Sequence, residues 1–211
     1  NGNSLDNSGN GQNGTPGSGI TFNLNRFLGG KGISAYGDGS ANAKMPFTTS
    51  KWWRDLTIML WFRCGFYTAD WRTFICIGLG SANFQNGFQI GITYSNDPAY
   101  PGKIFVISPM EGFSFPIIYS SKRYDDDNWH FLVLRRSTSD QKRILYVDGD
   151  FSVDGYASGN STTPGYESVF YYRATGNSGF LNGYLAEVAV FGRAFSHQEI
   201  SQYYQLATSA P

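Results

Sequence analysis

Two apolar runs separated by polar turn residues, within residues 127–151, constrain the fold of this chain more than any other stretch. Residues 128–136 are mostly apolar and aromatic, and residues 143–147 repeat that character before an Asp148-Gly149 pair. Branched and aromatic residues favour a pleated, half-buried surface, so both runs predict strands. Asp-Gly suits the positive φ of a tight hairpin turn, and a third short apolar run follows it. The stretch therefore predicts an antiparallel meander, which must bury one face against another layer.

A long strand is predicted over residues 56–66, because every even position there is apolar, up to and including Phe66. Side chains two residues apart lie on the same face of a strand, so we assign the even face to the core. Met59, Trp61 and Arg63 then lie on the other face. On that face we expect either a ligand or a covering loop.

One short helix is predicted near the end of the chain. Ser196 and Glu199 form a capping box, in which the Ser196 hydroxyl accepts from an early backbone amide and Glu199 reaches back. The helix should end near Ala207. We expect its apolar face to dock through Ile200, Tyr203, Tyr204 and Leu206.

The remaining sequence alternates turn-rich segments with short strand-like runs. At 211 residues the chain has the length of one all-β domain, so we expect a single domain over residues 1–211. Residues 1–19 are rich in Gly, Asn and Ser and form either a first loop or a linker. Further strands are expected at residues 20–24, 88–94, 103–108, 112–119, 168–173 and 185–191.

Charge and hydropathy exclude two classes of partner. The sixteen basic and sixteen acidic residues give a formal net charge of zero, whereas nucleic-acid binding depends on clustered positive charge. No apolar stretch approaches the roughly 18 residues that a membrane-spanning helix needs. We therefore expect neither nucleic acid as a partner nor insertion into a membrane.

Six stretches resemble, in the same order, the motifs of one family. The central pair is WHFLV at residues 129–133 and LYVDG at residues 145–149. The pattern is similar to laminin-G-like, concanavalin A-like jelly-roll domains, and it spans residues 6–200. The resemblance implies an all-β fold, namely an antiparallel two-sheet jelly-roll sandwich with one short C-terminal helix, and a structural role for His130. The other four stretches are residues 6–14, 36–40, 56–62 and 182–200.

The same resemblance implies Ca²⁺ as a cofactor, held by loop carboxylates and backbone carbonyls. The positions that match the family's loops are Asp6, Asn10 and Asp38. The family's closing strand usually begins Asp-Glu-Val, and this chain has Ala186 where structural relatives use a side chain as a ligand. The acidic run at residues 125–127 lacks EF-hand spacing, and we interpret it as a solvated turn.

Cys64 and Cys76 are the two cysteines of the chain. They lie equally far from Asp70, so a hairpin centred on Asp70 would set them opposite each other and permit a disulfide. The alternative is two buried thiols that behave as small hydrophobic residues. Both interpretations stay open, and the spacing matches no zinc site.

The sequence contains no pattern typical of a catalytic site, and we expect no enzymatic activity. A Gly-x-Ser-x-Gly turn of serine hydrolases is absent. Glycoside hydrolases need two carboxylates about 5–10 Å apart, and those of the resembled fold supply them from one strand as Glu-x-Asp-x-x-Glu. None of the four glutamates lies in such a pattern; they are Glu111, Glu167, Glu187 and Glu199.

Aromatic residues are more numerous than a core of this size needs, with 14 Tyr, 17 Phe and 5 Trp. Sugar rings present apolar C–H faces that stack on exposed aromatic rings, while amides and carboxylates bind the hydroxyl groups. Residues of these types at predicted loops and strand ends form our candidate ligand-binding site. They are Trp71, Tyr94, Asn96, Asp97, Tyr100 and Tyr119.

The function that these observations favour is non-catalytic recognition of a glycan or polysaccharide on a cell or particle surface. We expect the chain to be part of a larger secreted, cell-surface or virion-surface protein. One alternative is a structural, adhesion or virion decoration domain that contacts neighbouring protein subunits. The other is a glycoside hydrolase or lyase with an unfamiliar arrangement of carboxylates, using Glu111 or Glu187.

Overall fold

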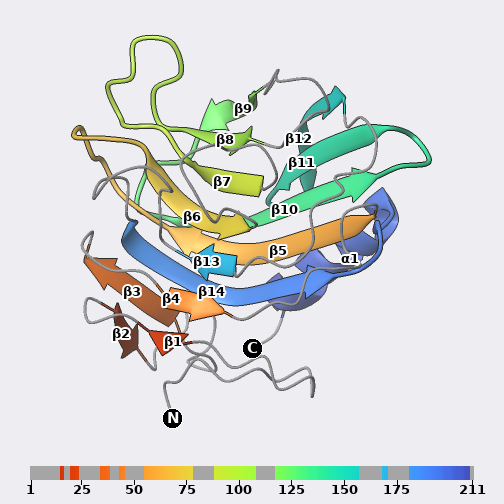
Figure 1. The fold of residues 1–211 in the computed structure, drawn as a ribbon, viewed down its shortest axis with the longest axis horizontal. Helices are drawn as coiled ribbons and strands as arrows, with labels where there is room; N and C mark the ends of the chain where they lie inside the picture. Colours follow the sequence, from red (N-terminus) through yellow and green to blue (C-terminus); the bar gives the residue numbers. More distant parts are fainter. Residues whose placement is uncertain are drawn as a thin grey trace.

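Two antiparallel sheets packed face to face make up the fold in the computed structural model of the protein (Figure 1). The structure describes residues 55–75, 89–107, 117–155 and 181–209 in full, and the backbone alone of other residues within strands. The first sheet, here called the β8 sheet, has the order β1 (Thr15–Pro16), β4 (Ala43–Met45), β13 (Ser168–Phe170), β6 (Arg72–Ile77), β7 (Phe88–Ile92), β8 (Lys103–Ile107) and β9 (Ile118–Arg123).

The second sheet, here called the β10 sheet, carries helix α1 (His197–Ser209) on its outer face. Its order is β12 (Asp150–Tyr156), β11 (Lys142–Val147), β10 (Trp129–Ser137), β5 (Leu56–Arg63), β14 (Asn182–Phe191), β3 (Ser34–Asp38) and β2 (Ile20–Asn23). The predicted two-sheet, all-β sandwich with a short C-terminal helix is confirmed. No helix among the described residues has the length and apolar character needed to cross a membrane.

The central meander is confirmed as β10, β11 and β12, which pair in sequence order. Its Asp148-Gly149 turn has positive φ at both residues, 55° and 83°, as the pair of residue types predicts. Elsewhere β9 begins only at Ile118, later than predicted, and most of residues 112–119 lie outside the described part of the chain. β14 begins three residues earlier than predicted, at Asn182.

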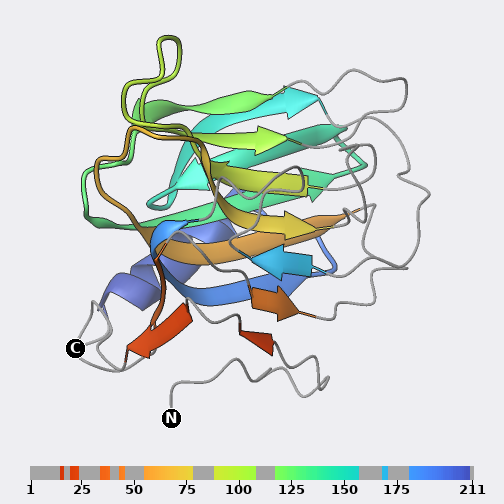
Figure 2. The ribbon, with the colours of Figure 1, turned by 60° about the vertical axis from the view of Figure 1, so that its left-hand side comes forward.

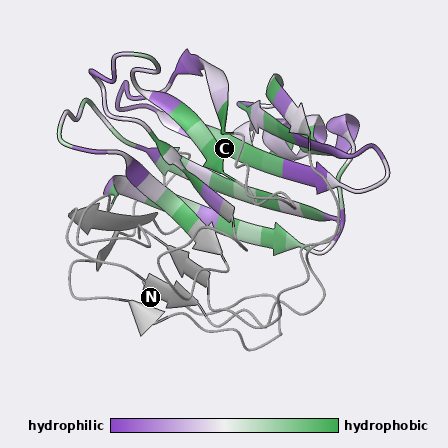
Figure 3. Cartoon of the chain, turned by 45° about the horizontal axis from the view of Figure 1, so that its top comes forward, coloured by the Kyte–Doolittle hydropathy of each residue, from purple (hydrophilic) through white to green (hydrophobic). Residues whose placement is uncertain are grey.

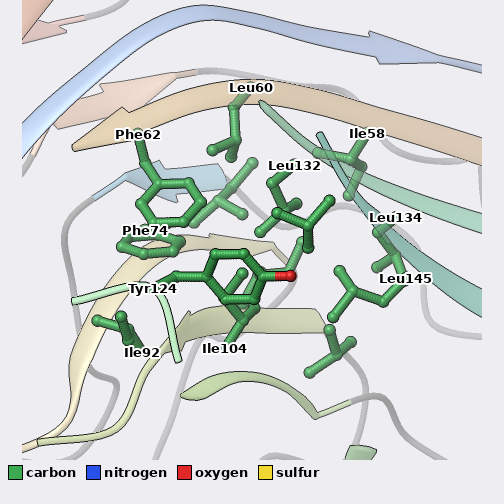
Figure 4. Close-up of a cluster of buried hydrophobic side chains, with 14 of the residues drawn as sticks. Ile58, Leu60, Phe62, Phe74, Ile92, Ile104, Tyr124, Leu132, Leu134 and Leu145 are labelled. Carbon is green, nitrogen blue, oxygen red and sulfur yellow. The ribbon is translucent and has the colours of Figure 1, made fainter. Parts of the chain in front are cut away.

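The main hydrophobic core lies between the two sheets, and its side chains come from both (Figure 4). Hydrophobic residues lie mainly along the strands (Figure 3). The even face of β5 is buried in this core as far as Cys64, as predicted. Phe66 is a correction, because β5 ends at Arg63 and the Phe66 side chain is 70% exposed.

The odd face of β5 is covered by α1, and neither a ligand nor a loop is needed to explain its burial. Met59 and Trp61 belong to a second apolar cluster with Phe131 of β10 and Ile200 of the helix. The capping box is confirmed, because the Ser196 backbone N–H donates to a Glu199 carboxylate oxygen at 2.7 Å. One predicted docking residue is a correction, because Leu206 is 72% exposed, whereas Ile200 is fully buried. The rings of Tyr203 and Tyr204 both stack on Phe131, with centroids 6.2 and 6.0 Å away, and Tyr203 stays partly exposed. The helix also continues two residues past Ala207, to Ser209.

No hairpin joins Cys64 to Cys76, because β5 and β6 belong to different sheets. The chain crosses from one layer to the other between them, so the predicted symmetry about Asp70 has no structural counterpart. Cys64 is a free thiol. Burial in the core raises the pKa of this thiol to about 12, so it stays protonated and behaves as a small hydrophobic residue.

Candidate functional site

The candidate site lies at one end of the sandwich, where two connections meet (Figure 2). Residues 64–71 join β5 to β6, and residues 93–102 join β7 to β8. The Ser95 backbone N–H donates to the Tyr67 carbonyl at 2.6 Å, and the Tyr67 N–H donates to the Ser95 hydroxyl at 2.8 Å. These bonds hold the two connections together as one rim.

Asp97 organises this rim through three hydrogen bonds to its carboxylate. One oxygen accepts from the backbone N–H groups of Ala99 at 3.0 Å and Tyr100 at 2.8 Å. The other oxygen accepts from the indole N–H of Trp71 at 3.1 Å. Burial alone would raise the pKa of Asp97, but these N–H donors outweigh it and the pKa is lowered. Asp97 is therefore a charged residue that ties one connection to the other.

Four aromatic rings gather beside Asp97, and we call them the aromatic cluster: Trp71, Tyr100, Phe105 and Tyr119. Trp71 packs on Phe105 with ring centroids 4.8 Å apart and meets the edge of Tyr119 at 6.3 Å. Tyr100 stacks on Tyr119 with centroids 3.6 Å apart and planes 4° from parallel. The cluster is therefore a continuous set of ring contacts, with Trp71 and Tyr100 from the two connections and Phe105 and Tyr119 from the neighbouring strands β8 and β9.

Strand register places Phe105 at the centre of this cluster. Phe105 of β8 lies opposite Tyr119 of β9 on one side and Gly91 of β7 on the other. A Cβ atom at Gly91 would lie 2.8 Å from the Phe105 ring, so glycine leaves the space that the ring occupies. Phe105 is fully buried, whereas Tyr100 is 39% exposed and is the most exposed ring of the cluster.

Four of the six candidate residues therefore come together: Trp71, Asp97, Tyr100 and Tyr119. Tyr94 contributes its backbone carbonyl, which accepts from Asp97 and Gly102 at 3.1 Å each, and its ring joins no contact of the cluster. Asn96 is exposed beside Asp97. Sequence reasoning missed Phe105, although the alternation of β8 around Ile104 and Val106 carried the signal.

Behind the rim lies the acidic run at residues 125–127, which the structure divides between two environments. Asp125 is buried, and its carboxylate accepts from the Arg123 guanidinium at 3.0 and 2.8 Å. A Cβ atom at Gly102 would lie 2.2 Å from that carboxylate, and the φ of Gly102 is 61°. Only glycine fits at this position. Because Gly102 has no side chain, the rim can pack directly against the acidic run. Asp126 and Asp127 are exposed.

His130 joins the acidic run to the meander. Its Nδ1 lies 2.8 Å from the Asp148 carboxylate and its Nε2 lies 3.0 Å from Asp126. Burial alone would lower the pKa of His130, but the bonds to Asp148 and Asp126 outweigh it and the pKa is raised. Asp148 also accepts from the backbone N–H of Phe131 at 2.9 Å. His130 thus connects the acidic run to the meander.

The predicted calcium ligands fall mostly outside the described residues, since Asp6 and Asn10 lie there. Asp38 ends β3, where its backbone pairs with Asn182. Ala186 is buried against the second apolar cluster. Among the described residues, no group of three or more His, Cys, Asp or Glu side chains is placed to hold a metal ion. A calcium site stays a prediction.

Residues 30–201 match the family described as the concanavalin A-like lectin/glucanases superfamily. None of the curated proteins matches the chain.

Solved structures show the same fold. Domain 4 of AbnA, an extracellular arabinanase from Geobacillus stearothermophilus in complex with arabinotriose, aligns over 96% of this chain and 93% of its own, with 15% identity and a TM-score of 0.70. The binding domain of Paraclostridial Mosquitocidal Protein 1 aligns over 96% of this chain with 13% identity and a TM-score of 0.70. The binding domain of Botulinum Neurotoxin DC in complex with SialylT aligns over 97%, with 12% identity and a TM-score of 0.70. The chain spans 49% of each of these two toxin domains.

Proposed function

Because the chain belongs to the concanavalin A-like lectin/glucanases superfamily, we propose that it is a non-catalytic module that binds carbohydrate through the aromatic cluster. The glycan or polysaccharide lies on a cell or particle surface. The module is one part of a larger secreted, cell-surface or virion-surface protein. Two similar structures support this proposal, since one is described in complex with arabinotriose and another with SialylT.

The observation that carries the proposal is a partly exposed Tyr100 ring held rigidly at the rim. Tyr100 is fixed by its stack on Tyr119, by the Asp97 carboxylate at its N–H, and by the Thr93 hydroxyl at its carbonyl. Ordering a loop when a ligand binds costs free energy and lowers affinity, so an aromatic surface that is already fixed favours sugar binding. The apolar C–H face of a sugar stacks on such a ring.

The placement of the glutamates supports a non-catalytic role. Glu199 caps α1 and pairs with Arg193 at 2.8 Å. Glu187 is exposed at an irregularity in the β14–β5 pairing, where its φ is 51°. A hydrolase needs two carboxylates facing one sugar bond. Neither of these two glutamates lies at the aromatic cluster, and Glu111 and Glu167 fall outside the described residues.

A glycan array tests the proposal with three proteins: wild type, Tyr100→Ala and Tyr203→Ala. Tyr203 is the matched control, because this tyrosine lies on α1, away from the aromatic cluster, and is 43% exposed, against 39% for Tyr100. We expect specific glycan binding that Tyr100→Ala abolishes and Tyr203→Ala retains. A repeat with a calcium chelator tests the site expected at Asp6, Asn10 and Asp38.

Three outcomes contradict the proposal. Wild type that binds no glycan, while forming a stable oligomer, favours a structural or adhesion domain instead. Release of sugar from any arrayed polysaccharide favours the hydrolase alternative. Binding that survives in Tyr100→Ala keeps carbohydrate recognition but removes it from the aromatic cluster.

A further inference from the structure

Two cations lie beside the aromatic cluster, on the strands that carry Phe105 and Tyr119. Lys103 begins β8 and Arg123 ends β9, and the two are direct partners in the antiparallel register. The β8–β9 pairing shifts register between Lys103 and Phe105. The pairing of β8 with β7 is regular and continues to Lys103, so Lys103 and Phe105, two residues apart, share a face of β8. Lys103 also closes the turn that carries Tyr100, because its backbone N–H donates to the Tyr100 carbonyl at 3.3 Å.

These two cations are compensated very differently. The Arg123 guanidinium makes two hydrogen bonds to Asp125, of which the shorter is 2.8 Å. Lys103 takes part in none of the ion pairs among the described residues. Like charges directly opposite each other on a sheet are destabilising, so the position opposite Arg123 does not stabilise the positive charge of Lys103.

The carboxylate closest to the cluster does not serve Lys103 either. Both oxygens of Asp97 accept hydrogen bonds from Trp71, Ala99 and Tyr100, and the residue is only 8% exposed. The Asp97 carboxylate therefore already has its hydrogen-bond donors within the rim. An uncompensated ammonium group remains on the face of β8 that presents the ring cluster, and it suits an anion supplied by a ligand.

We propose that the ligand is an acidic glycan, whose sugar ring stacks on Tyr100 and whose carboxylate or sulfate contacts Lys103. This inference rests on the proposed function and names the substrate class of the same site. Lysine is a compact point charge with three rotatable donors, so it accommodates a carboxylate and a sulfate equally. Neutral glycans offer Lys103 only hydroxyl groups, which form weaker hydrogen bonds with it than an anion does.

The test uses pairs of polysaccharides that differ only in charge. Polygalacturonate is compared with its methyl ester, and dextran sulfate is compared with dextran. Each is titrated against wild type, Lys103→Met and the control Lys122→Met, at low and high salt. Lys122 is an exposed lysine of β9 outside the aromatic cluster, and its replacement changes net charge by the same amount as that of Lys103.

We expect wild type to bind at least one charged polysaccharide about tenfold more tightly than its neutral counterpart, the size of one charge-assisted contact. Lys103→Met should remove that difference, and Lys122→Met should keep it. High salt should weaken binding of the charged member only. Preference for polygalacturonate identifies a carboxylate ligand, and preference for dextran sulfate identifies a sulfate.

The inference fails separately from the proposed function. Equal binding of charged and neutral members, with loss in Tyr100→Ala, overturns the acidic ligand and leaves carbohydrate recognition standing. If Lys103→Met and Lys122→Met lose the preference for the charged polysaccharide equally, that preference depends on net charge alone. This result also overturns the anion subsite at Lys103. Absence of binding to every member, and to every acidic and neutral glycan of the array, overturns both. Melting temperatures of the variants show that each is folded.

Discussion

Asp97 illustrates how a single buried carboxylate can position an aromatic surface. Sequence reasoning assigns it a direct contact with a sugar, because acidic side chains bind hydroxyl groups. In the structure all its hydrogen bonds are internal, and they join Trp71 on one connection to Ala99 and Tyr100 on the other. Asp97 is thus a positioning residue, and exposed Asn96 beside it is the better placed of the two to reach a ligand.

Replacement of Asp97 by alanine should therefore affect both stability and binding. Three N–H donors lose their acceptor, and a buried donor left unpaired costs about 1–3 kcal/mol. We expect the urea midpoint to fall and glycan affinity to fall with it, since Tyr100 is no longer fixed. Asn96→Ala, one residue away, should leave the midpoint unchanged. Equal midpoints for wild type and Asp97→Ala would contradict the positioning role.

At the scale of elements, α1 is an amphipathic cover for one face of β5 and β10. Ile200 is its one fully buried residue among those described, and it packs with Met59, Trp61 and Phe131. Helical periodicity alone selects Ile200, Tyr203, Tyr204 and Leu206 as a docking face. The periodicity cannot fix which edge of that face turns toward the sheet, because this depends on the position of the helix over β10.

Ile200→Ala and Leu206→Ala form a matched pair on this one helix. Ile200 is fully buried, so its truncation should cost about 2–5 kcal/mol of unfolding free energy. Leu206 is 72% exposed, and its truncation should change that free energy by less than about 0.5 kcal/mol. Chemical denaturation measures both. A comparable loss in the two variants would mean that the helix docks in a different orientation.

Features that depend on neighbouring residues could be predicted from the sequence, whereas features that depend on contacts between distant segments could not. Runs such as residues 128–136 are mostly apolar and rich in branched and aromatic residues, so the strands and the meander follow from neighbouring residues alone. The predicted hairpin between Cys64 and Cys76 was wrong, because the chain crosses from one sheet to the other between them. Turn residues are of the same types whether the chain folds back or crosses, so the sequence could not distinguish the two. The contact between Trp71 and Asp97 depends on how two connections, 26 residues apart, meet at the rim.

Stability of the whole molecule should depend on pH through His130. Its pKa is raised above the ordinary 6.5 by Asp148 and Asp126, against the effect of burial. A raised pKa in the folded state gives stability that is complete below about pH 6.5 and is lost as pH rises through the raised value. Asp126, whose pKa is lowered to about 2, contributes above its ordinary 3.8 and loses this contribution as pH falls toward 2.

Urea midpoints measured from about pH 5.5 to about pH 8.5 test the histidine. We expect the wild-type midpoint to fall across this range and His130→Gln to show a flatter dependence. His197→Gln is the control, because His197 is exposed on α1, and it should keep the wild-type slope. A slope that persists in His130→Gln would assign the dependence to another group.

The alternation of β8 has a consequence for how such a domain can diverge. Ile104 and Val106 point into the core that holds the two sheets together, while Phe105 between them supports the rim. Selection for a folded protein and selection for a new ligand therefore act on different residues of the same strand. Under the proposed function, substitutions at Tyr100 or Lys103 would change the ligand and leave the interior residues Ile104 and Val106 in place. Solved structures with only 12–16% identity to this chain share its fold, so most of its residues can change while the two sheets stay in place.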